Sequence, residues 1–117
     1  MKALDTNILV RLLVNDDPAQ ARTVRRLFER TEEERGSLFV ADLVILELIW
    51  VLGSAYDCTR EEITDALESL LTLGALQLEN PERVRELVRT SREEKTGLAD
   101  LFIGLAAKHS GCETTLT

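Results

Sequence analysis

Three acidic residues of this 117-residue chain stand alone in apolar segments, and their types could carry chemistry. Asp5 follows the short run that ends at Leu4, Glu47 lies within VILELIWVL, and Asp100 lies within GLADLFIGLAA. Ionised carboxylates are almost never fully buried without a partner, because removing a charge from water is costly. If these three meet at one place, we expect a divalent cation to offset their repulsion.

A cation held by such acids is suited to phosphoryl chemistry. Mg²⁺ and Mn²⁺ prefer hard oxygen ligands, and Mg²⁺ usually keeps several waters beside a few carboxylates. The metal lowers the pKa of a bound water, orients a phosphodiester and stabilises the leaving oxygen. On this interpretation Asp5, Glu47 and Asp100 are both the metal ligands and the catalytic residues.

Each acid also has a simpler structural explanation. An aspartate after a strand is often a helix cap or turn residue. A lone glutamate in an apolar helix can extend to solvent or pair with an arginine from elsewhere. Glu47 shares a helical stripe with Leu43 and Trp50, from which we expect it to lie close to the core face.

Short β-like runs alternate with amphipathic helical ones, so we predict a single α/β domain over residues 1–117. We expect a three-layer α/β/α sandwich with a mostly parallel sheet of four to five strands. The functional crevice of such a sheet lies beyond the carboxyl ends of its strands, where Asp5 stands. The predicted strands are residues 2–5, 37–41, 75–78 and 112–117, and the predicted helices are residues 7–14, 18–34, 42–55, 59–74, 81–95 and 98–110.

Several helix starts have sequence signals. Asp16-Asp17-Pro18 indicates an acidic cap followed by proline at the first helical position. Asp42 is predicted to cap the third helix. Thr59 and Glu62 match a capping box.

Composition and charge narrow the function classes. A hydrophobic fraction of 44% and a charged fraction of 30% are typical of an ordinary globular domain. The net charge of −7 argues against a passive nucleic-acid binder with a basic face, but metal-binding acids contribute to such a balance. Cys58 and Cys112 have no zinc-site spacing and predict free thiols in a reducing compartment. No apolar stretch reaches membrane-spanning length, so we predict a cytoplasmic protein without membrane association.

The three acidic segments together resemble the PIN-domain family, and within it the VapC-type toxin ribonucleases. The opening MKALDTNILVRLLVNDDPAQ looks like the start of a PIN domain, whose first strand ends in Asp-Thr-Asn or Asp-Thr-Ser. VADLVILELIWVL resembles the second acidic segment and GLADLFIGLAAKHSGCETTLT the third. The resemblance covers the whole chain, with the segments in the family's order.

This resemblance implies a metal-dependent endoribonuclease in which Asp5, Glu47 and Asp100 hold Mg²⁺ or Mn²⁺. A metal-activated water would attack the phosphodiester in line and leave a 3′-hydroxyl and a 5′-phosphate. Asn7 would hold one of the acids in place, whereas Asp42 fits a helix cap better than a metal ligand. Members of this size are usually dimeric toxins of type II toxin–antitoxin pairs. The implied partners are therefore an RNA substrate, a cognate antitoxin protein and a second copy of the chain.

The C-terminal end departs from the family pattern. The family usually supplies a further aspartate after the last strand, and this chain ends at Thr117 before that position. We therefore expect the end of the fold to be truncated. The missing acid favours an alternative function, a non-catalytic PIN-like module whose acidic pocket binds metal or a partner's arginine. A receiver-like phosphoryl-transfer domain is a third hypothesis, but it needs paired acids after the first strand and a later lysine, and neither is clear.

Other candidate residues have plainer explanations. Trp50 is expected in the core or a dimer interface, with antitoxin contact as a lesser alternative. His109, near a helix end, fits the helix dipole or solvent. Four arginines could form a basic lip for RNA phosphate, although solvated helix surface explains them better. They are Arg11, Arg22, Arg25 and Arg26.

Overall fold

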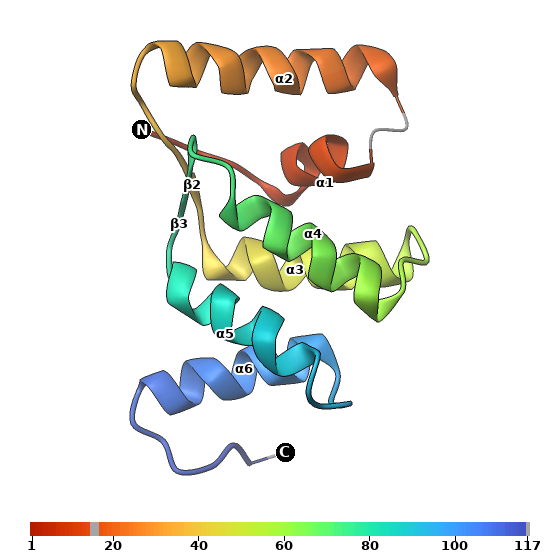
Figure 1. Ribbon diagram of the computed structural model, residues 1–117, viewed down its shortest axis with the longest axis vertical. Helices are drawn as coiled ribbons and strands as arrows, with labels where there is room; N and C mark the ends of the chain where they lie inside the picture. The colour runs from red at the N-terminus through yellow and green to blue at the C-terminus, as the bar shows by residue number, and fades with distance from the viewer. Residues whose placement is uncertain (15–16, 117) are drawn as a thin grey trace.

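The computed structural model describes residues 1–14 and 17–116, which form a parallel three-stranded sheet and six helices (Figure 1). The predicted α/β class and parallel sheet are confirmed. Within these ranges no helix is long and apolar enough to cross a membrane. The strands are β1 (Lys2–Ala3), β2 (Leu38–Val40) and β3 (Leu76–Leu78). The helices are α1 (Thr6–Val14), α2 (Pro18–Glu33), α3 (Asp42–Ser54), α4 (Arg60–Leu71), α5 (Pro81–Ser91) and α6 (Leu98–His109).

The sheet has the order β1-β2-β3, with β2 in the centre. Leu38 of β2 is in register with Lys2 on one side and with Leu76 on the other. Because all three strands run in parallel, their carboxyl ends meet at one edge. Helices α1, α3 and α5 each begin within four residues of that edge. The topology therefore gathers three helix starts beside one another.

The predicted fourth strand is wrong for residues 112–116, and Thr117 lies outside the described residues. Gly111, with a φ of 92°, follows the end of α6, and residues 112–116 are exposed and form no strand. A strand needs a hydrogen-bonded neighbour, and Figure 1 shows the C-terminus on the far side of α6 from the sheet. The described sheet therefore has three strands instead of four to five, and the three-layer arrangement stays a prediction.

Asp17 confirms the predicted start of α2. Its Oδ1 accepts hydrogen bonds from the backbone N–H of Ala19 at 3.0 Å and of Gln20 at 3.3 Å. Pro18 is the first helical residue, where the missing N–H costs nothing. Asp16, which belongs to the same signal, lies outside the described residues.

The predicted capping box at the start of α4 is also confirmed. The Glu62 N–H donates to Thr59 Oγ1 at 3.1 Å, and the Thr59 N–H donates to Glu62 Oε1 at 2.8 Å. Three other predictions about helix ends differ from the structure, and one of them is the end of α4, which lies at Leu71 rather than near residue 74. Ala41 is the N-cap of α3, so Asp42 is a helical residue whose side chain does not cap the helix. Helix α5 ends at Ser91 rather than near residue 95.

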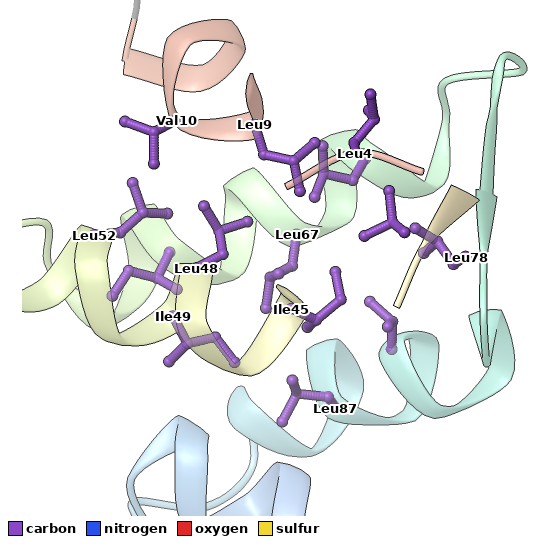
Figure 2. Packing of buried hydrophobic residues seen from close by; sticks show 14 of the residues in the cluster. Leu4, Leu9, Val10, Ile45, Leu48, Ile49, Leu52, Leu67, Leu78 and Leu87 are labelled. Carbon is purple, nitrogen blue, oxygen red and sulfur yellow. The ribbon is translucent and has the colours of Figure 1, made fainter. Parts of the chain in front are cut away.

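The hydrophobic core is centred on α3, which packs against α1, α4 and α6. Figure 2 shows side chains of α1, α4, α5 and β3, such as Leu9, Leu67 and Leu78, gathered around the buried side chains of α3. Four α3 side chains lie in the core, and they define its buried face. They are Ile45, Leu48, Ile49 and Leu52.

We predict that Leu48→Ala lowers the free energy of unfolding by about 2–5 kcal/mol, because the Leu48 side chain is fully buried. The matched control is Leu43→Ala on the same helix, where 78% exposure leaves an expected change within about 0.5 kcal/mol. Urea unfolding of both variants measures the difference. Equal costs at the two positions would mean that α3 presents a different face to the core.

Candidate functional site

Asp5 stands at the carboxyl edge of the sheet, directly before α1. It is exposed, and its Oδ1 accepts a hydrogen bond from the Ile8 N–H at 3.1 Å. Asp5 therefore caps α1, as the simpler explanation of this residue predicts. One carboxylate oxygen is engaged in the cap, and the side chain remains open to water at the edge where parallel sheets bind ligands.

Glu47 lies on the exposed face of α3. Leu43, one turn before it, is 78% exposed, and Trp50, one turn after it, is 69% exposed. The shared stripe is therefore real, but the prediction that it faces the core is wrong. Exposure also excludes the core position for Trp50, whereas its positions in a dimer interface or an antitoxin contact stay predictions. Apolar residues occur on both faces of α3. The face that packs into the core is the one opposite Leu43, Glu47 and Trp50.

Asp100 lies in the first turn of α6 and is exposed. It lines a pocket of about 460 Å³ together with Trp50 of α3 and Arg60 of α4. Gly97 directly precedes the helix, and a Cβ at that position would lie 3.7 Å from Asp100 Oδ2, an ordinary van der Waals distance. Asp100 and the exposed face of α3 thus border one cavity.

The three acids come from elements that meet at α3. Helix α3 carries Glu47, and it packs against α1, which follows Asp5, and against α6, which carries Asp100. All three side chains are exposed, so the expectation of buried carboxylates is wrong. In residues 1–14 and 17–116, no three His, Cys, Asp or Glu side chains gather closely enough to hold a metal ion together.

The carboxylates nevertheless match the chemistry of a hydrated divalent cation. Mg²⁺ usually binds through one or two carboxylates and completes its octahedral shell with water and substrate phosphate. Exposed hard oxygens on adjoining helices suit that mode, whereas they would not suit a soft metal that requires thiolate. A full cage of three protein ligands is not needed for such a site.

A second polar cluster follows β2 and β3, and the sequence patterns did not identify it. The Asp42 carboxylate pairs with Arg83 Nη1 at 2.5 Å and accepts a hydrogen bond from Asn80 Nδ2 at 2.9 Å. The Asp42 N–H donates to Glu79 Oε1 at 2.9 Å. Asp42 is the first helical residue and Ala41 holds the N-cap position, so the Asp42 carboxylate bonds to α5 and to the residue before it instead of capping α3. The sequence did contain a signal for this cluster, because Asp42 and Asn80 each follow a predicted strand of the parallel sheet.

The same cluster extends to the end of α6. Arg83 Nε donates to His109 Nδ1 at 3.1 Å, and His109 Nε2 lies 2.9 Å from Glu86 Oε2. Lys108 Nζ is 3.1 Å from Glu86 Oε1. The hydrogen bonds from His109 and then from Lys108 lower the pKa of Glu86 below its ordinary value. His109, expected to meet only the helix dipole or solvent, therefore joins α6 to α5.

A family model described as PIN domain matches residues 2–117. The chain belongs to the PIN domain family. It is similar to a VapC ribonuclease of Aquifex aeolicus (strain VF5), at 26% identity over 117 residues, which span 100% of this chain and 86% of that relative. No solved structure matches the chain significantly. The family resemblance carried by the three acidic segments is thereby confirmed.

Two further predictions concern the α1–α2 side of this PIN domain. Asn7 is exposed beside a pocket that Arg11 also lines, and its side chain contacts no candidate acid by a hydrogen bond within the described residues, so its supporting role stays a prediction. The basic lip stays a prediction, with solvated helix surface as its simpler explanation. Arg11 and Arg26 line one pocket of about 450 Å³ with Arg30, which the sequence analysis did not single out. Arg22 and Arg25 are exposed elsewhere on α2.

We predict that Arg83→Ala lowers the free energy of unfolding by about 1–3 kcal/mol, because it leaves the part-buried Asp42 carboxylate without its cation. Arg85→Ala is the matched control on the same helix. Its ion pair with Glu82 is exposed and contributes about 0–1 kcal/mol. Denaturant unfolding of both variants tests this, and equal losses would contradict a structural role specific to Arg83.

The lowered pKa of Glu86 predicts a pH-dependent contribution to stability. A carboxyl whose folded pKa is depressed stabilises the fold above its unfolded value, near 4.5, and loses that contribution as pH falls through the lower folded pKa. Glu86→Gln should therefore be less stable than the parent at neutral pH, by up to about 1 kcal/mol. The difference should shrink below pH 4.5, measured by urea unfolding across the acid range. A constant difference over that range would contradict the assignment.

Proposed function

We propose that this PIN domain is a metal-dependent endoribonuclease and the toxin component of a type II toxin–antitoxin pair. The full-length similarity to a VapC ribonuclease supports this function. The structural observation that carries it is the position of the three exposed acids: Glu47 on α3, Asp100 on the adjoining α6, and Asp5 at the carboxyl edge of the sheet, directly before α1, which also packs against α3. We further propose that the protein acts in the cytoplasm. Its proposed partners are an RNA substrate, an antitoxin protein and a second copy of the chain.

The proposed ligands of Mg²⁺ or Mn²⁺ are Asp5, Glu47 and Asp100. When bound, the metal supplies an activated water and neutralises charge on the phosphodiester. The chain's own contribution is to hold these carboxylates on α3, on α6 and directly before α1, three helices that pack together at α3. Asp5 is fixed by its capping bond to the Ile8 N–H, which limits where its second oxygen can point. Hydrolysis would leave a 5′-phosphate and a 3′-hydroxyl.

Metal-dependent cleavage of a panel of single-stranded and structured RNAs tests the proposal. Asp5→Asn is the sharpest variant, because asparagine can still cap α1 through its side-chain oxygen while the negative charge is removed. Asp5→Asn, Glu47→Gln and Asp100→Asn should each lower the cleavage rate about 100-fold or more, since even groups that only support a metal ligand cost 10–100-fold. Glu29→Gln, an exposed acid on α2, is the control and should leave the rate unchanged.

The products identify the chemistry. Products with a 5′-phosphate, which phosphatase removes, would agree with in-line attack by water. Products with a 2′,3′-cyclic phosphate would mean attack by the RNA's own 2′-hydroxyl and would contradict a metal-activated water. Cleavage that persists in all three acid variants would also contradict the proposed site.

The exposure of the acids favours one alternative function. Because they form no group of three among the described residues, a non-catalytic PIN module could use Glu47 and Asp100 to bind metal or a partner's arginine. This alternative predicts metal binding by calorimetry that the Asp100→Asn variant weakens, with no cleavage of any RNA in the panel.

A further inference from the structure

The pocket beside Asp100 has a composition that the metal chemistry does not explain. Its walls come from α3, α4 and the start of α6, and its volume of about 460 Å³ lies in the range of small-ligand sites. Most of the lining is apolar, with Ile49, Ile63 and Leu98 on its floor side buried in the core. Hydrated carboxylates and a metal need no such apolar surface.

Trp50 supplies the largest flat surface at this pocket. Its side chain is 69% exposed and follows Glu47 by one helical turn, while Asp100 lines the same cavity from α6. An indole this exposed leaves a large apolar area in water, which a stacked ring would cover. The ring therefore lies in the same pocket as Asp100 and on the same exposed face of α3 as Glu47.

Arg60 adds a positive charge to the same pocket. Its guanidinium donates to the backbone carbonyls of Ser91 at 3.1 and 3.2 Å, of Glu94 at 2.9 Å and of Thr96. These acceptors are neutral, and no Arg60 ion pair occurs in the part of the chain that the structure describes. The charge is thus held in place without being neutralised. One of these acceptors, the Ser91 carbonyl, belongs to the last residue of α5, and the other two lie in the segment between α5 and α6.

We infer that this pocket binds an unpaired nucleobase of single-stranded RNA, stacked on Trp50, with a neighbouring phosphate attracted by Arg60. The inference rests on the proposed nuclease function and adds its substrate class. Aromatic side chains bind unpaired bases of any sequence by stacking, and an arginine beside them favours the backbone phosphate. A paired base keeps both faces covered by its neighbours, so a duplex cannot use the pocket.

Trp50 is the single tryptophan of the chain, so its fluorescence reports on this pocket alone. Titration of the full chain with an eight-nucleotide single-stranded RNA should quench the emission saturably. The same RNA annealed to its complement should not quench. Leu43→Ala, on the same exposed stripe but outside the pocket lining, should behave as the parent does. Absence of quenching by an RNA that the parent cleaves would overturn the inference.

Cleavage kinetics supply a second readout. Trp50→Ala should raise KM about tenfold or more with little change in kcat, which is the scale of losing one base-stacking ring. Trp50→Phe should restore most of the affinity, because it keeps an aromatic face. An unchanged KM in Trp50→Ala would overturn the inference and leave the nuclease function standing.

Two outcomes separate the inference from its alternatives. If Trp50 emission changes with protein concentration in the absence of RNA, and sedimentation shows association that Leu43→Ala also weakens, the stripe is a protein interface and the inference is wrong. If RNA quenches Trp50 saturably but no RNA is cleaved with either metal, the nucleobase site is supported and the proposed nuclease function fails.

Discussion

The packing of α3 against α1, α4 and α6 is the interaction on which the placement of every candidate residue depends. This helix is apolar over most of its 13 residues, so its sequence alone does not define a single buried face. Ile45 and Leu48 enter the core, and the stripe with Glu47 and Trp50 is left in water. Because neighbouring residues of a helix are separated by about 100°, a rotation by one position would bury Glu47 and remove the site.

Two arginines connect the rest of the structure to this arrangement. Arg83 joins α5 to the start of α3 through Asp42 and to the end of α6 through His109. Arg60 joins the start of α4 to the end of α5 and the segment before α6. Both arginines involve α5, which packs against α6, the helix that carries Asp100. Arginine suits this work because its planar guanidinium makes several directed hydrogen bonds while it keeps its charge.

Exposure of the carboxylates has a consequence for metal binding and for RNA. Acids in water avoid the desolvation cost that burial would impose, so the fold is stable without a cation between them. The proposed metal would then bind as a hydrated ion, helped by the substrate's own phosphate. With a net charge of −7, the chain repels RNA at long range, and the local charge of Arg60 and of the arginines between α1 and α2 opposes that repulsion.

Local signals in the sequence were sufficient for much of the fold. The helix starts at Asp17 and Thr59 were predictable because a cap depends on atoms within three residues. The parallel sheet followed from the alternation of apolar strands with amphipathic helices. The fourth strand did not form because a strand depends on a neighbour distant in sequence, and residues 112–116 have none. Family membership was likewise recognisable from three local segments around Asp5, Glu47 and Asp100.

The sequence by itself determined which residues could do chemistry, because their type and order are local properties. Only the tertiary structure decided which of them meet and which face water. The choice of the buried face of α3 placed Trp50 beside Asp100, and the cluster of Asp42, Arg83 and His109 joins residues from three helices. Such contacts arise from competition among whole helix faces for one core. No spacing within a single segment encodes the outcome of that competition.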